Sequence, residues 1–182
     1  MKISKLFPLG LLTALALLAG TTTAPAQNAA KVEVAGVSFT PPTGWKAVPP
    51  PSPMRKAQFA IKTADGKDGA EVVFFVFPSG EAGSVAANVE RWYKKFTEDR
   101  EKINAKSESV TVGKSKVTYV QAEGTYDNAI PGGAPDLKPN YGLLGAIVET
   151  SIGNIFIRFT GPKELAKSTL PDFKKMVESG LK

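Results

Sequence analysis

The sequence contains neither cysteine nor histidine, and these two absences exclude several kinds of chemistry. A chain without cysteine forms no disulfide bond, so packing alone must stabilise it. Without either residue the chain also lacks a Ser-His-Asp triad, a Cys-His pair and the ordinary ligands of zinc. The commonest hydrolase mechanisms and zinc sites are therefore excluded.

Long apolar runs are also scarce, because the 182 residues contain one such run and it lies near the start of the chain. It covers about residues 6–19, follows Lys2 and Lys5, and precedes small residues at 24–26. Basic, apolar and small residues in this order are typical of a secretory signal peptide. The run is also shorter than the roughly 20 apolar residues that span a bilayer. We therefore expect a signal peptide that is removed after Ala26.

The rest of the chain is long enough for one domain with its own core. The prediction is a signal peptide at 1–26, a flexible leader at 27–31 and a single domain at 32–182. The signal peptide predicts export to a periplasm or to the outside of the cell, with no transmembrane segment after cleavage. A retained N-terminal anchor is the alternative, whereas a lipid anchor on cysteine is excluded.

The charge of the mature domain is mild. Removal of residues 1–26 takes away two lysines and no acidic residue, which leaves 21 basic and 17 acidic groups and a net charge of +4. Stretches such as "ERWYKKFTEDREK" mix both signs, as a solvated surface does. A nucleic-acid-binding domain usually gathers its basic residues on one face, with aromatic residues between them. We therefore expect no nucleic-acid partner.

Apolar patterns predict strands in the first half of the domain. Val32 to Phe39 turns at Ala35 and Gly36, which indicates a short hairpin. The stretch 55–63 alternates apolar and polar residues, as a half-buried strand does, and 72–77 is apolar at every position, which favours a central strand. The turn between them, "ADGKDG", lacks the spaced acidic ligands of a calcium loop.

The stretch "GEAGSVAANVERWYKKF" predicts a turn followed by a helix. Ser84 is placed to cap the helix by accepting a backbone hydrogen bond. The apolar residues that follow fall on one helical stripe: Val85, Val89, Trp92, Tyr93 and Phe96. The glycines before them lack the Gly-Lys-Ser/Thr sequence of a phosphate-binding loop, so a helix cap is favoured over an anion site.

The second half of the domain repeats the order of strands and then a helix. The predicted elements are strands within 107–126, a loop at 127–140, strands at 143–148 and 155–159, and a helix from 162 that Pro171 interrupts. A loop this long inside a domain is typically mobile or functional. The overall order of elements predicts an α+β fold, an antiparallel β-sheet with helices packed on it.

Several local phrases resemble one family of proteins. They are "GSVAANVERWYKKF", "LLGAIVET", "NIFIRFTGP" and "DFKKMVES". Together with the element order over residues 32–181, they resemble exported bacterial proteins of the PsbP/Mog1-like α/β/α sandwich class. The resemblance implies a non-enzymatic binding or assembly role and carries over no catalytic residues. It does not imply attachment to a photosystem, because the chain has neither a plastid-type leader nor histidine.

Two classes of function remain open. The first is an exported binding or accessory module for an unknown protein or small ligand of the cell envelope, with no cofactor and no metal. The second is an envelope hydrolase that uses paired carboxylates, for which Glu123, Asp127 and Glu149 are the candidates if the sheet brings them together. Isolated acidic residues on strands are more often solvated surface groups.

The binding module is expected to use a surface near the loop at 127–140, because rigid scaffolds commonly carry functional loops. The nearest polar or aromatic contributors are Asn88, Arg91, Trp92 and Arg158. Each has a plainer interpretation, since Trp92 shares the apolar stripe of the helix and Arg91 fits an ordinary solvated side chain.

The position of signal cleavage is directly testable. N-terminal sequencing of the secreted protein should begin at Gln27, because small residues at 24–26 satisfy the specificity of signal peptidase. An exported product that still begins with Met1 would contradict this prediction.

Overall fold

The computed structural model describes residues 31–130 and 132–182, and the predicted signal peptide lies outside them. Its strands are β1 (Val32–Val34), β2 (Val37–Phe39), β3 (Lys46–Ala47), β4 (Arg55–Lys62), β5 (Asp68–Pro78), β6 (Lys106–Val112), β7 (Ser115–Asp127), β8 (Leu137–Thr150) and β9 (Gly153–Pro162). Its helices are α1 (Val85–Tyr93) and α2 (Lys163–Ser179). Neither helix of this described part has the length and apolar composition of a membrane span.

Seven strands form one antiparallel sheet in the order β3-β4-β5-β9-β8-β7-β6. The strands β5, β9 and β8 lie in its middle, and their sequences are apolar at successive positions because both of their faces are covered. The short β1–β2 hairpin forms a separate two-stranded sheet and contributes the buried Val34 and Phe39 to the core. The prediction of an antiparallel sheet with packed helices is confirmed.

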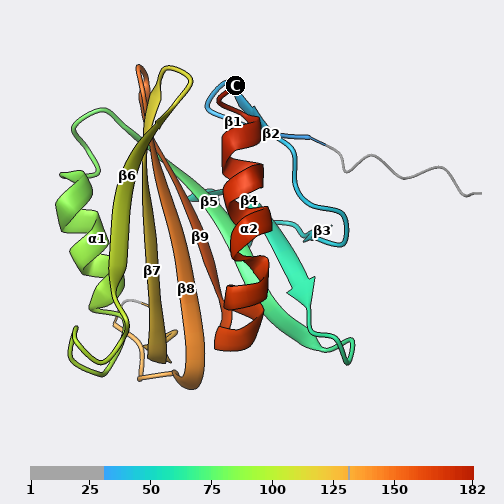
Figure 1. Ribbon diagram of the computed structural model, residues 1–182, viewed down its shortest axis with the longest axis vertical. Helices are drawn as coiled ribbons and strands as arrows, with labels where there is room; N and C mark the ends of the chain where they lie inside the picture. Colours follow the sequence, from blue (N-terminus) through green and yellow to red (C-terminus); the bar gives the residue numbers. More distant parts are fainter. Residues whose placement is uncertain (1–30, 131) are drawn as a thin grey trace, which may run out of the picture.

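Helix α2 covers one face of the sheet (Figure 1). Its buried face carries Phe173, Met176 and Val177, which pack into the larger core cluster. The strands contribute alternate residues to this cluster, among them Ile155, Ile157 and Phe159 of β9, together with Phe59, Val72, Phe74, Tyr119 and Val148 of other strands. This alternation is the period-2 pattern of a strand with one face toward a helix.

Helix α1 covers part of the opposite face (Figure 1). Here the intervening strand residues are buried with α1 in a second cluster that includes Val120, Leu143, Ile147 and Phe156. The Ser84 hydroxyl accepts a hydrogen bond from the Ala87 backbone N–H at 3.1 Å, as a helix cap does. The helix ends at Tyr93, so Phe96 follows it rather than belonging to it, although its ring remains buried.

Two further predictions about the extent of elements differ from the structure. The loop at 127–140 is shorter, because the β7–β8 ladder continues past a register shift to the pair Asp127 and Leu137. Pro171 does not interrupt α2, which runs continuously through it. A proline inside a helix removes one backbone hydrogen bond, but the buried side chains at 173, 176 and 177 hold the helix on the sheet beyond it.

The contact between Trp92 and Gly145 determines how closely α1 approaches the sheet. A Cβ atom at Gly145 would lie 2.2 Å from Cζ3 of Trp92, far inside van der Waals contact. We expect Gly145→Ala to lower the free energy of unfolding by about 1–3 kcal/mol, the usual cost of overpacking. Urea denaturation measures this change.

The matched control is the same substitution in a Trp92→Leu background. Because the smaller side chain leaves room for the methyl group, Gly145→Ala should cost much less there, and the double-mutant cycle should show a clear coupling. An equal cost in both backgrounds would mean that the indole ring is not what excludes a side chain at this position.

Candidate functional site

The predicted binding residue Asn88 is a structural residue of α1. It was expected to contribute to a binding surface, but its side chain is only 5% exposed. Its amide donates hydrogen bonds to the backbone oxygens of Ala82 at 2.8 Å and Ser84 at 2.9 Å, and its Oδ1 accepts one from Arg91 at 2.7 Å. Asn88 therefore ties the preceding turn to the helix, and Arg91 is exposed beside it.

Trp92 and Arg158 lie on neighbouring parts of the same sheet face. The Trp92 indole covers Gly145, and Arg158 is paired with Gly145 across β8 and β9. The Arg158 guanidinium lies 5.7 Å from the centre of the Phe75 ring, a cation–π distance. Of the four predicted residues, Asn88 and Arg91 are therefore joined by a hydrogen bond, whereas Trp92 belongs to the core and Arg158 lies against Phe75.

The loop that follows β7 is held by its own polar groups. Asp127 accepts hydrogen bonds from the backbone N–H groups of Ala129 at 2.9 Å and Asp136 at 3.1 Å. The bond from Ala129 is the main reason that the pKa of Asp127 lies below its usual value. Two apolar side chains of this region, Ile130 and Leu137, are exposed.

The three candidate carboxylates do not come together. On the β7–β8 ladder Glu123 is paired with Gly142, whereas Glu149 lies seven residues further along β8, which is about 23 Å at roughly 3.3 Å per residue. Asp127 lies four residues along β7 from Glu123 and is bound by its own loop. A carboxylate pair for glycoside hydrolysis requires a separation of about 5–10 Å, so these residues do not form one.

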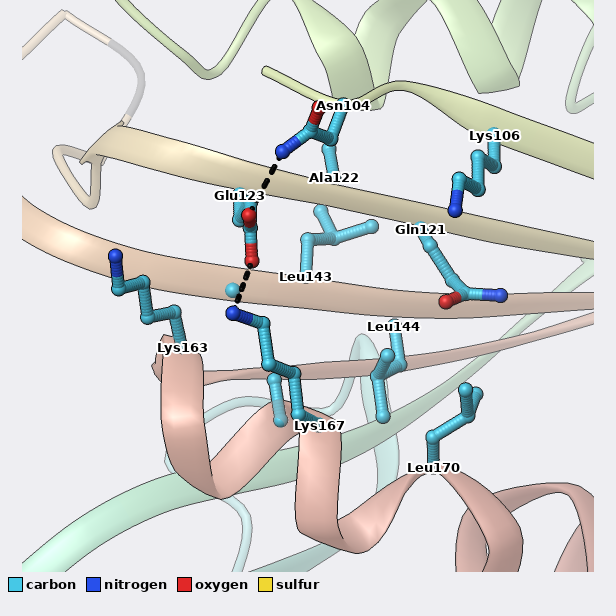
Figure 2. Close-up of a pocket in the computed structure, with 12 residues that line it drawn as sticks. Asn104, Lys106, Gln121, Ala122, Glu123, Leu143, Leu144, Lys163, Lys167 and Leu170 are labelled. Atoms are coloured by element: carbon cyan, nitrogen blue, oxygen red, sulfur yellow. Dashed lines mark hydrogen bonds and ion pairs between the residues drawn. The ribbon is translucent and has the colours of Figure 1, made fainter.

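A recess lined by charged, amide and apolar side chains lies between α2 and the edge of the sheet formed by β6, β7 and β8, and we call it the α2 recess. Its volume is about 380 Å³, within the range of small-molecule sites. The sheet side contributes Asn104, Lys106, Gln121, Glu123 and Leu144. The helix side contributes Lys163, Ala166, Lys167 and Leu170. Figure 2 shows the side chains of Lys106, Glu123 and Lys167 facing the space between the two elements.

The regular periods of helix and strand bring these residues together. The four helix residues are spaced at i, i+3, i+4 and i+7, so they lie on one face of α2. Gln121 and Glu123 alternate on β7 and point to the α2 side of the sheet. Gly142 permits close approach of the helix, because a Cβ there would lie 2.5 Å from the Ala166 Cβ.

Glu123 is held as a carboxylate in the wall of the recess. Its Oε1 accepts a hydrogen bond from Asn104 at 2.8 Å, and its Oε2 lies 3.2 Å from Nζ of Lys167. The Asn104 hydrogen bond, followed by the contacts with Lys167, lowers the pKa of Glu123, and the same contact raises the pKa of Lys167. Glu123 therefore remains ionised at neutral pH and is not a proton donor.

The other two lysines of the recess are uncommitted. Among the described residues 31–130 and 132–182, the ammonium groups of Lys106 and Lys163 form no ion pair or hydrogen bond, although the charge of Lys163 contributes slightly to the lowered pKa of Glu123. Figure 2 shows them on opposite sides of the Glu123–Lys167 pair. The lining thus combines three cations with one anion, beside amide groups and leucines. Such a lining can hold a negatively charged group next to an apolar one.

Sequence reasoning did not find this recess. The spacing of Lys163, Ala166, Lys167 and Leu170 places them on one helix face, but spacing alone does not show what lies opposite that face. Nothing in the local sequence around Lys106 indicated a binding site, because its proximity to α2 depends on strand pairing. Within the ranges that the structure describes, no three acidic side chains lie close enough to hold a metal ion.

Comparisons with known proteins identify the fold. No protein-family model matches the sequence, and no curated protein matches it. Among solved structures, the chain is similar to the solution structure of cyanobacterial PsbP (CyanoP) from Synechocystis sp. PCC 6803, with a TM-score of 0.51 and 11% sequence identity. The match covers 79% of this chain and 85% of that one. The chain therefore has a PsbP-like α+β fold.

Proposed function

We propose that this chain is an exported, non-enzymatic binding or accessory protein and that its ligand occupies the α2 recess. The observation that carries the proposal is the pair of uncommitted lysines, Lys106 and Lys163, in a recess of about 380 Å³. Convergent polar groups beside apolar walls are the usual features of a binding site. The resemblance to the PsbP/Mog1-like class implies a role in binding or assembly, which agrees with the proposed binding function.

The chemistry of the lining favours binding over catalysis. The lining contains no serine, threonine or tyrosine to act as a hydroxyl nucleophile. Its carboxylate, Glu123, is neutralised by Lys167 and has a lowered pKa, whereas a general acid at neutral pH needs a raised one. Charge, amide hydrogen bonds and apolar contact remain, and these hold a ligand without changing it.

Export is part of the proposal and rests on the leader at residues 1–26. Basic residues, an apolar run and small residues in that order direct a chain to the secretion machinery. The absence of cysteine is compatible with a periplasmic or an extracellular location, because the fold needs no disulfide. The ligand is accordingly expected among the small molecules or proteins of the cell envelope.

Filling the recess provides the test. Leu170 lines the recess and is half-buried, so Leu170→Trp should occupy the space and abolish ligand retention without breaking the core. The full-length precursor is expressed and exported, and the protein is purified under native conditions from the envelope fraction. Native mass spectrometry then measures non-covalently retained molecules, and their chemical identity is compared before and after incubation.

Met54→Trp is the matched control, because Met54 is an exposed apolar residue outside the recess. We expect wild type and Met54→Trp to retain the same molecule unchanged, and Leu170→Trp to retain none. Equal retention by all three proteins would place the ligand elsewhere. Conversion of the retained molecule during incubation would show an enzyme instead.

A further inference from the structure

The uncommitted charge in the α2 recess is positive. Glu123 neutralises Lys167 at 3.2 Å, which leaves Lys106 and Lys163 as the net charge of the lining. A cationic ligand would be repelled by both groups, and an uncharged one would make no use of them. The recess is therefore complementary to an anion.

One end of the recess places two groups of hydrogen-bond donors side by side. Lys106 is paired with Gln121 across β6 and β7, so the two side chains stand next to each other on the α2 face of the sheet. Together they present an ammonium group and an amide N–H₂, which are three donors and two donors respectively. Figure 2 shows both side chains at the same end of the recess, away from the Glu123–Lys167 pair.

An apolar wall continues directly from this polar end. Gln121 is paired with Leu144 across β7 and β8, so Lys106, Gln121 and Leu144 form one row across three strands. Leu170 of α2 lines the same recess as Leu144, and Figure 2 shows the two leucines next to each other. A ligand whose charged head meets Lys106 and Gln121 would place its adjoining atoms between the two leucines.

The row formed by Lys106, Gln121 and Leu144 favours one class of anion over others. Bidentate recognition of phosphate and sulfate groups relies on arginine forks, and no arginine lines this recess. A bare inorganic anion would also leave the wall of Leu144 and Leu170 unused. A carboxylate carries one negative charge, needs few donors and is commonly attached to an aliphatic chain.

We infer that the α2 recess binds a small aliphatic carboxylate, with its carboxylate group at Lys106 and Gln121 and its hydrocarbon chain between Leu144 and Leu170. This assignment rests on the proposed binding function and adds the class of ligand. A small molecule is favoured over a protein segment because the recess is walled by the sheet on one side and by the helix on the other.

Titration calorimetry of the mature protein with sodium hexanoate at pH 7 tests this assignment. We expect saturable binding that tightens about three- to fourfold for each methylene added from propionate to hexanoate, because each methylene is buried against leucine. Hexanamide and hexylamine, which have similar chains without the negative charge, should bind at least about tenfold more weakly. In NMR spectra of the protein titrated with hexanoate, changes in backbone amide chemical shift should be confined to residues of the recess.

Substitutions test the orientation. Lys106→Met should weaken hexanoate about tenfold, because it removes a charged hydrogen-bond donor but keeps the aliphatic stem. Lys106→Arg keeps the charge and should lose much less. Lys46→Met is the matched control, because Lys46 is an exposed lysine on β3, at the opposite edge of the sheet, and should leave the affinity unchanged.

Three outcomes would overturn the assignment: hexanamide binding as well as hexanoate, equal losses in Lys106→Met and Lys46→Met, or binding of the peptide acetyl-Ala-Ala-Leu without binding of hexanoate. The failures of the two proposals are distinguishable. If the exported protein retains a ligand of another class that Leu170→Trp loses, the binding function stands and the carboxylate assignment is wrong. If neither experiment detects binding in the recess, both are wrong.

Discussion

The register of the β7–β8–β9 ladder is the constraint on which the rest of the structure depends. Each residue of these strands faces either α2 or α1, and pairing of Glu123 with Gly142 and of Gln121 with Leu144 decides which. A slip of one residue would move every side chain to the other face. The core clusters would then be exposed, and the row that joins Lys106 to Leu144 would be lost with them. Folding and the recess therefore depend on the same register.

Helix α2 contributes both to the core and to the recess, because its two halves carry different residues. Its second half buries Phe173, Met176 and Val177 in the core, which supplies most of the apolar contact. Its first half carries Lys163 and Lys167, whose long side chains cover the surface while their charged groups stay in water. The small residue Ala166 lets this half approach Gly142 closely. The largest buried side chains thus lie toward one end of the helix, and the other end carries the lysines that line the recess.

The predictable part of the fold is the part governed by local periodicity. The alternation of 55–62, the continuous apolar run of β5 and the Ser84 cap each follow from neighbouring residues, and the structure contains all three. The extent of β7 and β8 and the continuity of α2 through Pro171 depend on tertiary contacts that override local preference. The recess was missed for the same reason, since Lys106 and Lys163 are brought together only by the completed sheet. Asn88 shows the reverse error, because a polar residue on a helix was read as exposed although the turn before it supplies its partners.

Glu123 illustrates why the same lining favours holding a ligand over transforming it. A carboxylate acts as an acid at neutral pH when burial or a neighbouring negative charge raises its pKa. Glu123 has the opposite surroundings, an amide donor on one oxygen and an ammonium group near the other, and its pKa is lowered. The ion pair also removes Lys167 from competition for an anionic ligand. The remaining positive charge belongs to Lys106 and Lys163, which lie on either side of the pair (Figure 2). An anion is therefore attracted to the ends of the recess and not to its middle.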